Sequence, residues 1–362
     1  MAYLAPKDYS KDPALLEAAA RKMAGDLDLD WMQKIRERAA FRPGNPHRGL
    51  TLADINGGSY GPDSVPELVR HNFSMAPRGA ILPKGLPSLG YTLNRKSEVW
   101  ADAALALFEE GKSRHWAPAR DIPWHALDGA DPASREERAL RQLCSLLSGV
   151  GLVCADIAAR AVYRLNIEFH EIKYLLCMQM LDGARIAEAT RKRALYGAGS
   201  LGVDSQALGE LLKMVADSDS YPQSSAGLNL HLASLLQSFA RHLEWATDNA
   251  ADAMIWTRVA QDASRFLSYG VDHLRTLLRA RPGEAEELNQ HLDLLDNGLV
   301  GALGATEVIE PLIVLSGGAQ PVARLYETLA AELFSRCESA GLGPRRARSP
   351  LCDFLKLLPG SS

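Results

Sequence analysis

The feature that most constrains the fold is a succession of long helical patterns that starts at Ser97 and continues almost to the end of the chain. Apolar residues recur there with the period of an α-helix, and alternating strand patterns are few. The predicted helices span 97–113, 134–165, 167–197, 205–217, 226–249, 250–281, 283–302 and 320–341. Those within 134–197 and 226–281 exceed the roughly 11–12 residues of an average helix, which favours a bundle of parallel rods. The sequence therefore predicts an all-α bundle.

Local signals mark several helix boundaries. Ser134 and Glu137 have the spacing of a capping box, in which each side chain caps the backbone of the other. Gly197 and Gly199 follow one predicted helix, and a Pro-Gly pair at Pro282 separates two others.

The N-terminal part of the chain is predicted to contain one helix and a long irregular segment. A helix is predicted from Lys11 to about Phe41, and the next fifty residues are rich in glycine and proline, which indicates an irregular arm with one short helix at Pro66 to His71. We divide the chain into an N-terminal helix and arm (1–96), a helical bundle (97–341) and a C-terminal tail (342–362).

Composition narrows the class of protein. The chain is 47% hydrophobic and 23% charged, which is typical of globular proteins and excludes disordered and collagen-like chains. Forty Lys and Arg against 44 Asp and Glu, for a net charge of −4, predict no nucleic-acid or anionic membrane partner. A short basic run, Arg345, Arg346 and Arg348, is interpreted as a solvated tail.

Cellular location follows from two further observations. The five cysteines are widely spaced and include no C-x-x-C pair, which favours a reducing cytoplasm. The N-terminus has no apolar signal segment, and no uninterrupted apolar run reaches the roughly 18 residues of a membrane span.

An internal repeat lies within the predicted bundle. Residues 178–188 and 258–268 are about 80 positions apart, and each segment has Asp followed by Arg three residues later. Asp182 and Arg185 are therefore neighbours on one helix face, as are Asp262 and Arg265. Two helix pairs related by a pseudo-twofold axis are implied.

These two segments resemble the ferritin-like di-iron carboxylate superfamily, whose second helix in each half has the pattern Gln-x-x-Asp-Glu-Ala-Arg-His. The superfamily includes the ribonucleotide reductase small subunit, the para-aminobenzoate N-oxygenases and bacterial multicomponent monooxygenases. The resemblance spans about residues 97–281, and the segment 169–182 is its best individual match. Residues 114–118 and 121–124 are similar to the segment that precedes the first bundle helix. The resemblance implies a ferritin-like four-helix bundle with additional helices.

The metal ligands that the resemblance implies are missing. A di-iron site needs one Glu from each of two helices and a Glu-x-x-His motif from each of the other two. The first motif falls on Gly183 and Ile186, and the second on Ala263 and Phe266. The two single glutamates fall near Gly151 and near Ala233, and no histidine has Asp or Glu three residues before it. We therefore expect no metal and no cofactor.

The small residues at these positions suggest a vacated space. Gly151, Gly183 and Ala263 leave volume where the ligands and metals of the superfamily lie, and protein interiors are rarely empty. Either Ile186 and Phe266 fill that volume, or a substrate binds there. In the second case all five residues would line a substrate site.

Asp182, Arg185, Asp262 and Arg265 are retained although the ligands are not. They are interpreted either as interhelical salt bridges or as a catalytic set in which a buried Asp with a raised pKa acts as an acid or base. Asp156 is one helical turn from Arg160, and it either pairs with Arg160 at the surface or points inward as a further catalytic acid.

Three functions follow as hypotheses. The first is a metal-free biosynthetic enzyme that catalyses a redox-neutral step, such as cyclisation, elimination or isomerisation, on a small apolar or aromatic substrate in the vacated cavity. The second is a non-catalytic partner of a metal-bearing di-iron oxygenase, whose arm covers that relative, a homodimer mate or its own bundle. The third is an oxygenase with a metal site relocated to Asp156, Asp182, Asp262 and a histidine. The small residues favour the enzyme, which predicts a closed cavity, whereas the partner predicts a packed interior and an exposed apolar patch.

Overall fold

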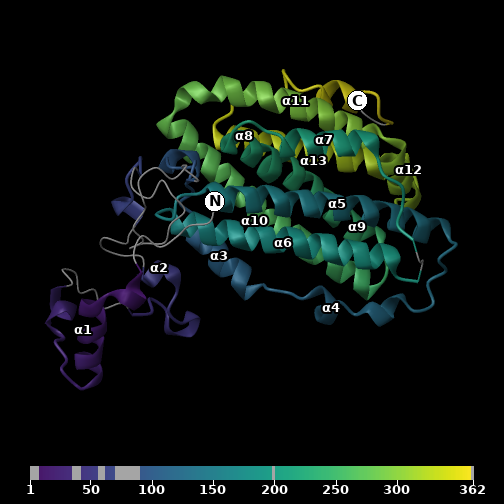
Figure 1. Cartoon of the computed structure of the whole chain (residues 1–362). Helices are drawn as coiled ribbons and strands as arrows, with labels where there is room; N and C mark the ends of the chain where they lie inside the picture. Colours follow the sequence, from purple (N-terminus) through teal and green to yellow (C-terminus); the bar gives the residue numbers. More distant parts are fainter. Residues whose placement is uncertain (1–7, 35–41, 56–61, 70–89, 198–199, 360–362) are drawn as a thin grey trace. The chain divides into compact units, whose positions relative to one another are not determined.

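The computed structural model describes residues 8–34, 42–55, 62–69, 90–197 and 200–359 of the 362-residue chain. It divides into two compact units, which are described separately (Figure 1). The first comprises Met1–Pro66 and Arg70–Thr92, and the second comprises Glu67–Val69 and Leu93–Ser362.

The described residues of the first unit form short helices. They are η1 (Tyr9–Lys11), α1 (Pro13–Met23), η2 (Asp30–Lys34), η3 (Pro46–Arg48), α2 (Leu52–Ile55) and η5 (Pro62–Ser64). The predicted helix from Lys11 to Phe41 is too long, because α1 ends at Met23 and Gly25 follows with a φ of +97°, a conformation that glycine alone adopts readily. The last part of that predicted helix, residues 35–41, lies outside the described residues.

The predicted short helix at 66–71 is also wrong where the structure describes it. Leu68 forms an isolated antiparallel bridge with Arg95, and the Val69 N–H donates to the Asn94 carbonyl over 3.0 Å. Residues 70 and 71 lie outside the described part of the chain.

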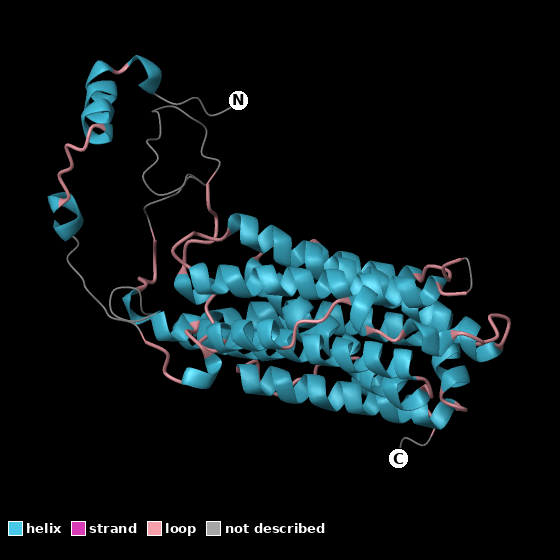
Figure 2. Ribbon diagram, turned by 90° about the horizontal axis from the view of Figure 1, so that it is seen from below, coloured by secondary structure: helices cyan, strands magenta, loops and turns pink. Residues whose placement is uncertain are grey.

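The second unit is a helical bundle, and its described residues contain no strand beyond isolated bridges (Figure 2). Its elements are η6 (Lys96–Glu98), α3 (Ala104–Ser113), α4 (Pro118–Asp121), η7 (Trp124–Leu127), α5 (Arg135–Arg164), α6 (His170–Leu195), α7 (Gln206–Ala216), α8 (Tyr221–Ala226), the π-helix η8 (Gly227–Leu232), α9 (Ala233–Ala246), α10 (Ala250–Ala280), η9 (Pro282–Glu284), α11 (Ala285–Gly304), α12 (Thr306–Leu315), α13 (Ala319–Ala340) and α14 (Leu351–Leu355). The predicted all-α class is confirmed.

Two long helix pairs form the centre of the bundle. Helix α5 packs along α6, and α9 packs along α10, while α3 contacts α6 and α10 (Figure 1). A further group of helices covers this four-helix core: α12 packs on α5, α11 on α7, and α13 on α9 and α10. The sequence did not predict α12, which contains Pro311, a residue that usually ends or kinks a helix.

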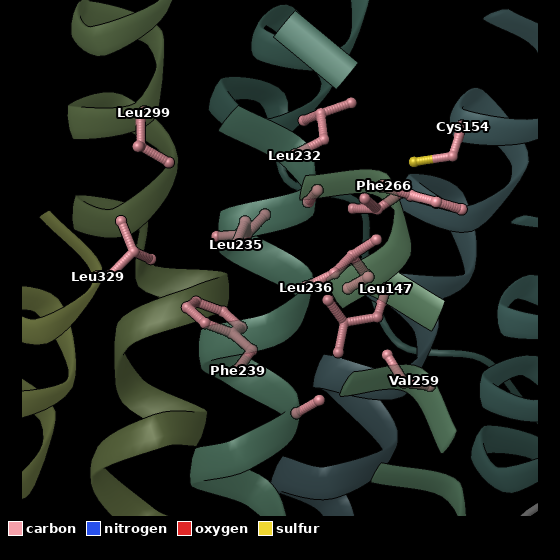
Figure 3. Close-up of a cluster of buried hydrophobic side chains, with 14 of the residues drawn as sticks. Leu147, Cys154, Leu232, Leu235, Leu236, Phe239, Val259, Phe266, Leu299 and Leu329 are labelled. Carbon is pink, nitrogen blue, oxygen red and sulfur yellow. The ribbon is translucent and has the colours of Figure 1, made fainter. Parts of the chain in front are cut away.

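One continuous apolar core joins these layers. Leu232, Leu235, Leu236 and Phe239 project from η8 and α9 toward side chains of α5, α10 and the covering helices (Figure 3). Helix α5 has the length and composition of a membrane span, with a mean hydropathy of 1.6 over 18 residues, as does the bent pair α11 and α12 taken together. The core helix of a water-soluble bundle has the same properties, so this composition does not identify a span.

An ion-pair network between Arg345 and acidic residues of α11 holds the C-terminal segment against the bundle. Arg345 is fully buried and donates to Asp296 Oδ2 over 2.7 Å, to Asp293 Oδ1 over 2.8 Å and to Asn289 Oδ1 over 2.8 Å. The interpretation of the basic run as a solvated tail is therefore wrong for Arg345, because acidic side chains of α11 neutralise it inside the protein.

Only one of the two hydrogen bonds of the predicted capping box forms at the start of α5. The Ser134 hydroxyl accepts a hydrogen bond from the Glu137 N–H over 3.1 Å, but the Glu137 carboxylate accepts two hydrogen bonds from Arg193 of α6. A complete capping box forms instead at Ser220 and Gln223, at the start of α8.

We expect Ser134→Ala to lower the free energy of unfolding by about 1 kcal/mol, because the first turn of α5 loses its hydroxyl acceptor. Ser134→Asp keeps an acceptor and should match the wild type. Urea denaturation followed by circular dichroism measures both variants, and equal midpoints for Ser134→Ala and wild type would contradict the assignment of this cap.

Candidate functional site

The repeated Asp and Arg residues of α6 and α10 meet in one buried cluster, which we call the quartet: Asp182, Arg185, Asp262 and Arg265. Each side chain is at most 3% exposed. Arg265 Nη2 lies 2.8 Å from Asp182 Oδ2, and Arg185 Nη2 lies 3.3 Å from both Asp262 oxygens. Each Arg also pairs with the Asp on its own helix, so that both guanidinium groups bridge both carboxylates. The quartet thus joins the two halves of the internal repeat.

The segment before the bundle covers the quartet. Trp116 is buried and its Nε1 donates to Asp262 Oδ2 over 3.0 Å, while its ring centroid lies 5.4 Å from the Arg185 guanidinium carbon. Arg185 Nη1 lies 2.9 Å from Nδ1 of His115, an exposed residue. Sequence analysis noted this segment only as part of the resemblance, since nothing local shows that its tryptophan reaches α10.

Charge in the quartet is balanced, with two carboxylates and two guanidinium groups. Burial, followed by repulsion from Asp262, raises the pKa of Asp182 to about 7, against the opposing effect of Arg265 and Arg185. Burial disfavours the charged form of Arg265, yet the two carboxylates raise its pKa above the ordinary value. The quartet is therefore a buried assembly in which Asp182 has a pKa of about 7, and its net charge is zero when both carboxylates are ionised.

The space expected at Gly151 and Gly183 is closed by backbone. A Cβ atom on Gly183 would lie 2.8 Å from the Ala155 nitrogen and 2.8 Å from the Gly151 carbonyl oxygen. A Cβ atom on Gly151 would lie 2.7 Å from the Ala187 nitrogen. Glycine allows α5 and α6 to approach until their backbones touch, so neither residue lines a cavity. The expectation of a substrate site at these two glycines is corrected accordingly.

The remaining vacated positions belong to the apolar core. Ile186 and Ala263 are fully buried, and Phe266 is 2% exposed. Figure 3 shows the Phe266 ring near Cys154 of α5 and Leu236 of α9. These contacts correspond to the alternative in which larger side chains fill the interior.

A second buried polar network lies between α6, α8, η8 and α10. Ser225 Oγ lies 2.9 Å from His273 Nδ1, and His273 Nε2 donates to the Glu98 carbonyl over 2.8 Å. Burial lowers the pKa of His273 to about 4, so this imidazole is neutral at pH 7. Asn229 of η8 donates to Ser225 Oγ over 3.0 Å and accepts from Gln179. Sequence analysis missed this network because its members have no common spacing.

Asp156 does not belong to the quartet. It is exposed on α5, as is Arg160, and neither side chain has an ion-pair partner within the described residues. The hypothesis that Asp156 points inward as a catalytic acid is therefore wrong. The alternative, an ion pair with Arg160, does not form either, because no carboxylate oxygen of Asp156 lies within 4.0 Å of a guanidinium nitrogen of Arg160.

The residues present do not fit a di-iron centre. Among the described residues, no group of three or more His, Cys, Asp and Glu side chains is arranged to hold a metal ion. Asp182 and Asp262, the acids nearest the vacated positions, bind guanidinium groups instead. A relocated site that combines them with Asp156 has no geometric support, because Asp156 faces outward.

Other parts of the bundle carry hollows. A groove of about 490 Å³ runs between α9 and α13 and includes His242 and Trp245, and another of about 340 Å³ between α7 and α11 includes His291. The small apolar void near Phe239 measures only about 10 Å³. None of these three is lined by the quartet or by the vacated ligand positions.

We expect Gly183→Ala to lower the free energy of unfolding by about 1–3 kcal/mol, because the added methyl group forces α5 and α6 apart. Gly149→Ala on α5 is a matched control, since a Cβ atom there meets nothing within 4 Å. The free energy of unfolding of Gly149→Ala should rise by about 0.5–1 kcal/mol, because alanine has a higher helix propensity than glycine. If urea denaturation gave the same change in the free energy of unfolding for Gly183→Ala and Gly149→Ala, the close backbone contact would be contradicted.

The raised pKa of Asp182 predicts a pH dependence of stability. The folded state binds the Asp182 proton more tightly than the unfolded state does. The stability that Asp182 contributes through this proton is therefore full at low pH and is lost as pH rises through about 7. The free energy of unfolding of wild type relative to Asp182→Asn should therefore decrease between about pH 4 and about pH 7 and change little above that range. Glu327→Gln, at an exposed position on α13, should follow the wild type, and parallel curves for wild type and Asp182→Asn would refute the shift.

Comparison with known proteins supports the fold. No model of a known protein family matches the chain, and no curated protein sequence matches it. Among solved structures, an R2-like ligand-binding oxidase with an aerobically reconstituted Mn/Fe cofactor aligns with a TM-score of 0.52 and 17% identity, covering 67% of this chain and 93% of that one. A valine-to-leucine variant of such an oxidase aligns with a TM-score of 0.54 and 16% identity, covering 66% and 94%. The second unit of this chain therefore has the ferritin-like fold of the R2-like ligand-binding oxidases.

Proposed function

We propose that this chain is a metal-free ferritin-like protein that acts by binding another ferritin-like chain, and not through chemistry at the centre of the bundle. The observation that carries the proposal is the backbone contact between Gly151 of α5 and Gly183 of α6. It occupies the place where the resemblance puts two carboxylate ligands. A glutamate at either position would require the two helices to separate.

Packing at the other vacated positions supports the same proposal. Ile186, Ala263 and Phe266 are buried in the continuous core, where an iron or manganese ion would have no oxygen or nitrogen ligands. The replacement of all the ligands together avoids the cost of leaving single carboxylates buried and unpaired.

In this proposal the quartet is structural. Removal of one member would leave a buried charge uncompensated, which is strongly destabilising, whereas the complete set is neutral. Because each Arg contacts the Asp of the opposite helix, the quartet fixes α6 and α10 in one register. The residues thus act as positioning residues for the bundle.

A partner is suggested by the surface of α5 and α6, where apolar side chains such as Leu152, Tyr163 and Leu181 are exposed. Sequence analysis linked a packed interior and an exposed apolar patch to the partner hypothesis, with a homodimer mate or a metal-bearing di-iron relative as occupant. We also propose a cytoplasmic location, because all five cysteines are free thiols in the structure.

The redox-neutral enzyme remains a prediction from the sequence. The observation in its favour is the raised pKa of buried Asp182, a property of catalytic acids. A substrate would need space beside the quartet, and the closed contact of α5 with α6 gives this hypothesis less support than the partner hypothesis.

Elemental analysis tests the metal-free assignment. The full chain, expressed with iron and manganese supplied and purified without chelator or His-tag, should contain less than about 0.1 metal ion per chain. Its melting temperature should not change with EDTA, because no metal contributes to folding. A di-iron ferritin-like protein prepared in parallel provides the positive control. A stoichiometric metal whose removal lowers the melting temperature would overturn the proposal.

A further inference from the structure

The groove of about 490 Å³ between α9 and α13 has no part in the proposed function. Helices α9 and α13 pack against each other, and residues from both line the groove. The residues of α9 recur at the spacing i, i+3, i+4 and i+7, which is one face of a helix. They are Ser238, Arg241, His242 and Trp245, and α13 contributes Arg324 and Leu325 among others. The volume of the groove is within the range of small-molecule binding sites.

The lining of this groove is positively charged, although the whole chain has a net charge of −4. Arg241 and Arg324 line the groove, and no described Asp or Glu does. Arg324 is exposed, and its guanidinium group makes no hydrogen bond or ion pair within the described residues. The groove between α7 and α11 is different, since it is lined by the acids Asp217, Asp219 and Glu287. An anion is therefore complementary to the groove between α9 and α13 and not to the other one.

Arg241 is held in place and still has free donors. Its Nη2 lies 2.5 Å from Glu332 Oε2 and donates to Gln237 Oε1 over 3.0 Å. The same Glu332 oxygen lies 2.7 Å from Arg336 Nη2, so one carboxylate faces two guanidinium groups. Both contacts of Arg241 use Nη2, which leaves its Nε and Nη1 without a hydrogen bond to the described residues. An anion in the groove would accept these hydrogen bonds and supply the missing counter-charge.

A buried hydroxyl group without a partner lies at the base of the groove. Ser238 is 3% exposed, and its Oγ forms no hydrogen bond with any described residue. Leu325 is 7% exposed, so the base of the groove combines this hydroxyl group with an apolar surface. A buried hydroxyl group without a hydrogen bond costs free energy, and a ligand that accepts its proton removes that cost.

An exposed indole ring lies beside the arginines. Trp245 is 63% exposed, and its ring centroid lies 5.4 Å from that of His242. His242 is held by Ser316, whose Oγ lies 2.7 Å from its Nε2. Burial lowers the pKa of His242, so this imidazole is neutral at pH 7 and adds no charge to the groove. The two rings offer a flat surface on which an aromatic ligand can stack.

We infer that the groove between α9 and α13 binds a small organic anion, made of a flat aromatic ring that carries a carboxylate or phosphate group. The anionic group pairs with Arg241 and Arg324, while the ring stacks against Trp245. Ser238 donates a further hydrogen bond. The inference is independent of the proposed function, because no residue of the groove belongs to the quartet or to the vacated ligand positions.

Isothermal titration calorimetry of the full chain tests the inference, with 1-naphthyl phosphate and 1-naphthoate as probes. We expect at least one of them to bind with a Kd of about 10–100 µM, which is typical of a ligand of this size. The Kd should rise with added NaCl, since salt screens the arginines. The neutral ring alone, 1-naphthol, and inorganic phosphate alone should each bind at least about 10-fold more weakly. The probe with the lower Kd identifies which anionic group the site prefers.

Single substitutions locate the binding site. Arg324→Ala should raise the Kd by about 10-fold or more, because a charge-assisted hydrogen bond is lost. Trp245→Ala should raise it by about 5-fold through loss of stacking. Ser238→Ala should raise it by about 3-fold or more without lowering the melting temperature of the free protein, in which this hydroxyl group has no hydrogen bond to lose.

Matched controls replace exposed side chains outside the groove. Arg191→Ala on α6 removes an exposed arginine, and Leu294→Ala removes an exposed apolar side chain from the groove between α7 and α11. Both variants should bind the probes as the wild type does. Circular dichroism confirms that every variant is folded.

Three results would contradict the inference: a Kd above about 1 mM for both probes, equal affinity for 1-naphthol and the anionic probes, or unchanged affinity in both Arg324→Ala and Trp245→Ala. A stoichiometric metal in the elemental analysis would refute the proposed function and leave this inference standing. Failure of the probes to bind would refute the inference and leave the proposed function standing.

Discussion

The bundle depends on how four buried charges are neutralised. Asp182, Arg185, Asp262 and Arg265 are almost inaccessible to water, and an isolated charge at that depth would cost several kcal/mol. Each charge has counter-charges both on its own helix and on the opposite helix. The pairing of α6 with α10 is thus linked to electrostatics as well as to apolar contact. Removal of any one of the four would leave a buried charge without its counter-charge, which gives a physical reason for their occurring together.

The glycine contact between α5 and α6 complements the quartet. The quartet holds α6 against α10, while Gly151 and Gly183 allow α5 to approach α6 more closely than side chains would permit. Phe266 of α10 is 2% exposed and belongs to the continuous apolar core of the bundle.

Sequence analysis predicted the long helices well because their apolar periodicity extends over many turns, as in α5, α6 and α10. It also identified the four quartet residues, because the repeat puts the same pair at the same spacing twice. Sequence analysis was wrong where the environment of a residue depends on its distance from residues far away in the sequence. Glycine at 151 and 183 suggests empty volume when the separation of the helices is unknown, and the burial of Arg345 depends on acids of α11 some fifty residues away. The N-terminal helix was drawn too long because the positive φ of Gly25 has no signature beyond the glycine itself.

The π-helix η8 has a consequence for the whole of α9. Gly227–Leu232 contains wider turns than the α-helices on either side, as when one residue has been inserted into a regular helix. That extra residue turns everything after it by about 100° about the helix axis. Leu235, Leu236 and Phe239 face the core because of this rotation (Figure 3). The same residues wound as a regular α-helix would present a different side of α9 to α10, so the wide turns of η8 determine which residues of α9 form the core stripe.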